Sequence, residues 1–157
     1  MRTRFTTNPG VSWQRMGRLP RRSPTANAAS TASSDDAMDA AFTVGERMGK
    51  SPIRCHDTPG FVVNRVLIPL LNDCLRVLDE ARVSPVDLDT AMTAGAGWPM
   101  GPCTLVDLVG IDVHVHASEA LYEKLREPRM APPPRIVAMK NAGLLGRKSG
   151  RGFYAYD

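Results

Sequence analysis

The chain has 157 residues, enough for one domain of ordinary size, and no apolar run in it is long enough to cross a membrane. Its net charge of +4 arises in residues 1–34, which hold six arginines and no acidic residue, whereas the remainder is slightly acidic. This distribution does not indicate a nucleic-acid-binding face on the folded part. The three cysteines have no CxxC spacing, which favours free thiols in a reducing compartment over a disulfide framework.

Residues 1–33 are rich in Arg, Ser, Thr, Ala and Pro, a composition that predicts disorder. An Arg-rich segment without acidic residues also has the composition of a transit peptide, although prolines and glycines interrupt any amphipathic helix. Two explanations stay open: a transit peptide, which would place the protein in mitochondria, or an unrelated leader on a truncated gene product. We favour the second and expect a cytoplasmic protein.

Residues 34–56 predict a helix followed by a short strand. Ser33 or Ser34 caps the helix, two aspartates follow in its first turn, and the helix ends near Met48. Residues 52–56 are a candidate strand with no second strand nearby to pair with. Because a single strand normally belongs to a sheet, we expect this segment to be a short α/β stub.

The stretch DTPGFVVNR at residues 57–65 opens the longest apolar helical pattern, which runs to about Ala81. Asp57 and Thr58 are candidate capping residues. Proline inside this helix, at position 69, is expected to kink it or to leave a local unpaired carbonyl.

One polar residue, Asn64, interrupts the apolar stripe of this helix. On a helical wheel it falls within about 40° of every member of the stripe, while Asn72 falls in a separate polar sector. The stripe consists of Ile68, Leu71, Leu75 and Leu78. A buried amide needs hydrogen-bond partners. Two readings of Asn64 stay open: a structural amide bonded to neighbouring backbone, or a ligand contact at a domain edge.

The remaining elements predict a mostly α fold. A capping box with proline at the first helical position begins a helix at residues 84–93, and three more helices follow. They cover residues 102–109, 112–126 and 135–142. The expected inner face of the second of these consists of Val113, Ala117, Ala120, Leu121 and Leu125.

Neither a dinucleotide fingerprint nor a metal site is indicated. Gly95, Gly97 and Gly101 lie in a loop that follows a helix rather than a strand, and their spacing does not match GxGxxG. His114 and His116 fall on different faces of a helix, so a shared metal is not expected.

The glycine-punctuated tail at residues 146–156 is first basic and then aromatic. Two readings stay open: a flexible end that Phe153 and Tyr154 fix to the core, or basic residues that contact an anionic ligand.

These elements resemble the C-terminal domain of the 3-hydroxyacyl-CoA dehydrogenases, including the bacterial 3-hydroxybutyryl-CoA dehydrogenases. Four motifs carry the resemblance, in the family's order, across about residues 34–157. They are GKSPI at 49–53, DTPGFVVNR at 57–65, GWPMGP at 97–102 with LVDLVGID at 105–112, and GRKSGRGFY at 146–154.

The resemblance implies a two-domain NAD-dependent enzyme that oxidises 3-hydroxyacyl-CoA to 3-oxoacyl-CoA. In this family an N-terminal Rossmann domain holds NAD and supplies a catalytic His–Glu pair, and the helical domain closes over the acyl-CoA and forms a homodimer. The motif asparagine matches Asn64, which implies a place beside the substrate. The lysine of the tail motif matches Lys148, which implies a place near the cofactor.

The chain departs from the family because it contains no GxGxxG after a strand and no catalytic histidine in the expected context. We therefore expect a disordered leader at 1–33, a Rossmann remnant at 34–56 and a helical substrate and dimerisation domain at 57–157. The chain alone is expected to bind NAD poorly and to be inactive, because hydride transfer needs an ordered nicotinamide and a base. The alternative is a non-catalytic dimerisation or acyl-CoA-binding module. A third possibility is that a separate Rossmann-domain chain docks onto residues 34–64 and rebuilds the site. Neither nucleic acid nor membrane is an expected partner.

Overall fold

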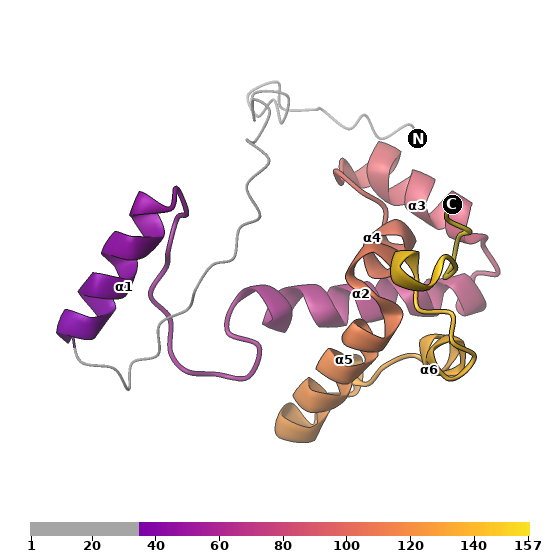
Figure 1. Cartoon of the computed structure of the whole chain (residues 1–157). Coiled ribbons are helices and arrows are strands. Elements are labelled where there is room, and N and C mark those ends of the chain that lie inside the picture. The colour runs from indigo at the N-terminus through magenta and orange to yellow at the C-terminus, as the bar shows by residue number, and fades with distance from the viewer. Residues whose placement is uncertain (1–34) are drawn as a thin grey trace, which may run out of the picture. The chain divides into compact units, whose positions relative to one another are not determined.

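The computed structural model describes residues 35–157, which form helices and connecting loops (Figure 1). Contacts divide the chain into two compact units, one ending at Arg54 and the other comprising Cys55–Asp157. The predicted leader and the predicted serine cap lie outside the described residues. Within the described part, no helix is long and apolar enough to cross a membrane.

The first unit contains helix α1 (Asp35–Arg47), close to the predicted bounds. Arg54 follows it in the chain and returns to it, donating a hydrogen bond of 2.5 Å to Asp39 and lying 5.4 Å from the centre of the Phe42 ring. The predicted strand at residues 52–56 is wrong, since only Arg54 occupies a single bridge position. A short strand needs a neighbouring ladder to be stable.

The second unit is helical, which confirms the mostly α prediction. Its elements are α2 (Val63–Glu80), α3 (Pro85–Thr90), the π-helical turn η2 (Ala91–Gly95), α4 (Pro102–Val109), α5 (Ile111–Leu125), the 3-10 turn η3 (Pro128–Met130), α6 (Pro134–Asn141) and the 3-10 turn η4 (Arg147–Ser149). Figure 1 shows α5 crossing α2 and the C-terminal tail lying beside α4, and both pairs are in contact.

The long helix α2 begins later than expected. Thr58 and Phe61 close a turn through a backbone hydrogen bond of 2.8 Å, and the helix starts after Val62 without a side-chain cap. The predicted caps Asp57 and Thr58 therefore do not cap it. Beyond this turn α2 continues through Pro69 without a break in its helical assignment.

The core lies between α2, α4, α5 and α6. The predicted stripe of α2 is buried, with Leu75 fully inaccessible, and residues of the other helices pack against it. These residues include Cys103, Val106, Ile111, Val115 and Ile136. A second cluster joins Ile68 to Leu121 and Met130. All three cysteines of the sequence lie in the described part and are free thiols, as predicted.

Asn72 is the buried amide of α2, which corrects its assignment to the polar sector. It is fully inaccessible and donates to the carbonyls of Arg129 and Met130 at 3.1 and 3.2 Å. Its oxygen accepts from Ser118 and lies 2.9 Å from the His114 ring. The buried face of α5 is thus centred on His114 and Ser118, and the prediction that Val113 and Ala120 lie inside is wrong, since both are exposed.

Asp107 of α4 fixes the C-terminal tail. Its buried carboxylate accepts from the backbone of Phe153 and Tyr154, each at 3.0 Å, and from the Tyr156 hydroxyl at 2.9 Å. Phe153 and Tyr154 also pack on the core. The prediction that aromatic residues fix the tail to the core is therefore confirmed.

Candidate functional site

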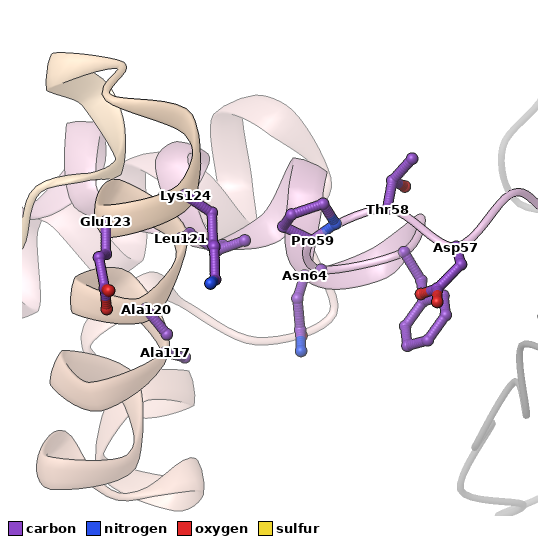
Figure 2. Close-up of a pocket in the computed structure, with 11 residues that line it drawn as sticks. Asp57, Thr58, Pro59, Asn64, Ala117, Ala120, Leu121, Glu123 and Lys124 are labelled. Atoms are coloured by element: carbon purple, nitrogen blue, oxygen red, sulfur yellow. The ribbon is translucent and has the colours of Figure 1, made fainter.

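A pocket of about 490 Å³ in the second unit lies between residues 57–64 and the last two turns of α5 (Figure 2). The first wall is the turn that precedes α2 together with the start of that helix. The second wall is one face of α5 and consists of Ala117, Ala120, Leu121, Glu123 and Lys124. Much of the lining is apolar, so the pocket suits an apolar ligand group with a few polar contacts.

Glycine at position 60 brings these walls together. Its φ of +80° lies in the left-handed region, which a residue with a side chain rarely adopts. A Cβ at this position would lie 2.9 Å from the Arg65 nitrogen and 3.0 Å from a Leu121 methyl group. The turn therefore approaches α5 closely because Gly60 has no side chain.

Asn64 lies in the first turn of α2 and lines the pocket. It is exposed, so the prediction that it is buried in the apolar stripe is wrong. Its position in the stripe lies beyond the end of the core, where no helix of the described residues covers it. The described residues offer its amide no side-chain hydrogen bond, and Figure 2 shows it extending away from α2 into the open space beside α5. The described residues therefore give Asn64 no side-chain hydrogen bond of the kind that a structural amide makes.

Charged groups stand at the edge of the pocket. Asp57, Glu123 and Lys124 line it, and none of them is ion-paired with another described residue. Close by in sequence, Arg65 and Glu127 form an exposed pair at 3.7 Å. The pocket thus offers one ammonium, two carboxylates and one amide to a ligand.

Lys148 lies elsewhere on the same unit. Its ammonium is 2.5 Å from the Asp112 carboxylate in the first turn of α5, and this hydrogen bond lowers the pKa of Asp112. It does not line the pocket that holds Asn64. Asp112 and Lys124 are twelve residues apart, about 18 Å along the helix axis. The two predicted site residues therefore lie toward opposite ends of α5.

The glycine loop at residues 95–101 does not form a dinucleotide cradle. It follows the π-helical turn η2 rather than a strand, as the sequence predicts. Gly101 instead makes room for Asp89, which accepts from the backbone nitrogens of Cys103 and Thr104 at 2.8 and 3.0 Å. This carboxylate belongs to α3 and caps the N-terminus of α4. No group of three potential metal ligands occurs in the part of the chain that the structure describes.

Sequence reasoning did not identify the α5 wall of the pocket as functional. Ala117 and Ala120 were expected to face the core, whereas Ala120 is exposed and both line the pocket. Nothing in the sequence pattern singled out Lys124 as a functional residue. The recurrence of Ala117, Ala120, Leu121 and Lys124 at intervals of three and four residues was the available clue.

Known proteins with similar sequences cover this unit. Residues 60–156 match the family described as 3-hydroxyacyl-CoA dehydrogenase, C-terminal domain. A probable 3-hydroxybutyryl-CoA dehydrogenase of Deinococcus radiodurans is 42% identical over 123 residues, which make up 78% of this chain and 44% of that protein. The mitochondrial hydroxyacyl-coenzyme A dehydrogenase of Homo sapiens is 42% identical over 110 residues, 69% of this chain and 35% of that protein. The chain spans less than half the length of these relatives.

Solved structures of known proteins are also similar to this chain. FadB2 of M. tuberculosis superposes with a TM-score of 0.77 at 37% identity, over 83% of this chain and 46% of that one. The (S)-3-hydroxybutyryl-CoA dehydrogenase of Ralstonia eutropha superposes with a TM-score of 0.77 at 36% identity, over 85% of this chain and 49% of that one. The chain therefore belongs to the family of the 3-hydroxyacyl-CoA dehydrogenase C-terminal domain.

Proposed function

We propose that this chain provides the acyl-CoA-binding and dimerising portion of an NAD-dependent 3-hydroxyacyl-CoA dehydrogenase of fatty-acid or hydroxybutyrate metabolism. The reaction is the oxidation of a 3-hydroxyacyl-CoA to the 3-oxoacyl-CoA. Relatives that carry this activity in their names support the proposal. Residues 34–56 would be the end of a Rossmann domain and residues 57–157 the substrate domain.

The observation that carries the proposal is the position of Asn64. An amide without a described hydrogen-bond partner faces an apolar pocket of about 490 Å³, as a group that orients the oxygen of an acyl substrate would. Asn64 also matches the motif asparagine that the resemblance places beside the substrate. We assign it the role of a substrate-side contact.

Within the described residues, the groups present do not by themselves fit NAD. The glycine loop at 95–101 lacks the strand–turn–helix context that a pyrophosphate cradle requires. Lys148, which the resemblance places near the cofactor, is held by Asp112 and stays half exposed, so it remains available to an approaching anion. NAD would supply the hydride acceptor in the intact enzyme. The chain alone is accordingly proposed to be inactive.

The test is acetoacetyl-CoA-dependent NADH oxidation by the purified chain, combined with calorimetric binding of acetoacetyl-CoA. An intact family enzyme is the positive control for turnover. Asn64→Ala removes the amide at the pocket, and Asn141→Ala removes an exposed amide at the end of α6. We expect no turnover, and binding that weakens about fivefold in Asn64→Ala but not in Asn141→Ala.

Two results contradict the proposal in different ways. Turnover that co-purifies with the chain and falls in Asn64→Ala would overturn its inactivity and reveal a cofactor site. A folded chain, judged by circular dichroism, that does not bind acetoacetyl-CoA would overturn the acyl-CoA-binding role.

The alternative is a helical module without activity of its own, whose site a separate Rossmann-domain chain completes. One observation favours it: α1 and the loop after it form a groove of about 350 Å³ lined by small and apolar side chains and by Lys50, and Val44 and Met48 in it are 55% and 67% exposed. Such a face is suited to covering by another domain. Turnover that appears only when a Rossmann-domain chain is added would support this alternative.

We also propose a homodimeric protein in the cytoplasm. Exposed valines on α2 support the dimer, and three free thiols support a reducing compartment. A mitochondrial location would follow if residues 1–33 act as a transit peptide.

A further inference from the structure

The wall that α5 contributes to the pocket changes in character along its length. Ala117, Ala120 and Lys124 recur at intervals of three and four residues, so they share one helical face. The two alanines leave room where larger side chains would fill the space. One turn further along, the same face ends in the Lys124 ammonium. The wall is therefore first apolar and then cationic.

Lys124 is the cation of this pocket. Among the described residues that line it, Lys124 alone is positively charged, and no described carboxylate pairs with it. Glu123 lies about 100° round the helix from it. Figure 2 shows Lys124 on the side of α5 that faces Pro59 and Asn64. By contrast Lys140, on α6, is paired with Glu119 of α5 at 3.9 Å.

We propose that this pocket selects acyl chains that end in a carboxylate, with Lys124 as the specificity-determining residue. The inference rests on the proposed function, because it assumes that an acyl group enters beside Asn64. The apolar wall contacts the methylene groups, and the Lys124 ammonium binds the terminal carboxylate.

The charge of Lys124 argues against a purely alkyl ligand. A methyl end that reached the ammonium would displace water from a charge without replacing its hydrogen bonds, which is unfavourable. A carboxylate replaces them with a charge-assisted hydrogen bond. The carboxylates of Asp57 and Glu123 disfavour an anion elsewhere along the rim, which leaves Lys124 as its place.

Matched ligands test the proposal with the full chain. Hexanoyl-CoA and hexanedioyl-CoA have six-carbon acyl groups and differ in the terminal carboxylate. We expect calorimetry at low salt to give about fivefold tighter binding of hexanedioyl-CoA. Lys124→Met keeps an unbranched side chain without the charge, and it should remove this preference by weakening hexanedioyl-CoA alone. Lys140→Met is the control and should keep the preference.

Three outcomes overturn the inference. Equal binding of the two ligands to the unmodified chain shows that the pocket does not read a terminal carboxylate. Equal weakening of both ligands in Lys124→Met assigns the ammonium to the CoA phosphates instead. Both results leave the proposed function intact. Failure of the folded chain to bind either ligand overturns the proposed function, and the inference with it.

Discussion

Two asparagines on α2 stand eight residues apart in opposite environments. Asn64 is exposed at the pocket, whereas Asn72 is fully buried and its amide makes four hydrogen bonds. Those of Asn72 connect α2 to His114 and Ser118 of α5 and to the η3 turn. One amide is thus available to a ligand, while the other stabilises the contact between three elements.

Asn72→Ala is expected to lower the free energy of unfolding by about 3 kcal/mol. The substitution leaves the carbonyls of Arg129 and Met130 and the His114 ring without their buried partner. Asn64→Ala, on the same helix, should change it by less than about 0.5 kcal/mol. Urea unfolding monitored by circular dichroism measures both. Equal losses in the two variants would show that Asn64 also has a structural role.

The sequence predicts the helix that carries both asparagines but not which one is buried. A helical wheel gives the direction of a side chain and not the extent of what covers it. Asn64 lies in line with the stripe at the end of the helix, beyond the core. Asn72 lies to the side, where η3 and α5 cover it. That cover comes from residues more than forty positions away, which periodicity cannot reveal.

His114 should make stability depend on pH. The Asn72 amide nitrogen donates to carbonyls, so its oxygen accepts and the neutral His114 ring donates from Nε2. Burial lowers the pKa of His114 to about 4. The unfolded chain binds the same proton near pH 6.5. Stability from this group is therefore complete above about pH 7 and is lost as pH falls, by about 3 kcal/mol near pH 4.

Urea midpoints measured between pH 4 and 7.5 check this dependence. His114→Gln removes the titrating ring and should flatten the profile relative to the unmodified chain. His116→Gln, at an exposed position of the same helix, should keep the slope. Carboxylates contribute equally to all three proteins and cancel in the comparison. Parallel profiles would place the pH dependence outside His114.

At the scale of elements, local motifs were predictable and long-range ones were not. Ser84 caps α3 as expected, accepting from the Asp87 nitrogen at 3.1 Å, and its hydroxyl donates to the Asp87 carboxylate at 2.6 Å. Helix α4 has the predicted bounds because proline begins it and glycine ends it. In contrast, the α4 N-terminus depends on Asp89, which lies fourteen and fifteen residues before its backbone donors Cys103 and Thr104, a link that no local pattern indicates.

The C-terminal tail depends on two glycines that lie against Asp107. A Cβ on Gly146 would overlap the Asp107 backbone, and one on Gly152 would overlap its carboxylate. Gly146 has a φ of +89°. The tail therefore needs both a positive φ and an empty space where a side chain would stand.

Gly146→Ala should destabilise the chain by roughly 3 kcal/mol or more, whereas Gly143→Ala should cost about 1 kcal/mol. Both glycines have a positive φ, but Gly143 faces open space. The difference between the two losses of stability therefore measures the cost of the overlap with Asp107. Amide exchange at Phe153 and Tyr154, whose N–H groups bond to Asp107, reports undocking of the tail. Equal effects of the two substitutions would mean that backbone strain alone matters.

At the scale of the whole molecule, α2 carries a second apolar face that the described residues leave uncovered. Val63 and Val66 are 53% and 62% exposed, and Val77 continues the same face at 37%. The buried stripe occupies the neighbouring sector of the helix. The periodicity of the sequence predicts that α2 is long and apolar. It does not show which apolar sector of the helix packs in the core and which is left for a partner.

We expect this face to form the dimer interface, because stable association buries about 800 Å² per partner around an apolar centre. Val66→Lys places a charge on the face and should convert a dimer to a monomer in light scattering. Val86→Lys, equally exposed at 59% but on α3, should leave the dimer intact.

The oligomeric states of the unmodified chain and its variants test two points: whether the α2 face forms the dimer, and whether the acyl-CoA pocket is complete within one chain. If the unmodified chain is a clean monomer that does not aggregate, the α2 face does not pair with a second copy. If both lysine variants dissociate, the interface extends over α3 and is larger than the valine face. If only Val66→Lys dissociates and still binds acyl-CoA, the pocket is complete within one chain, because its lining residues all belong to the second unit.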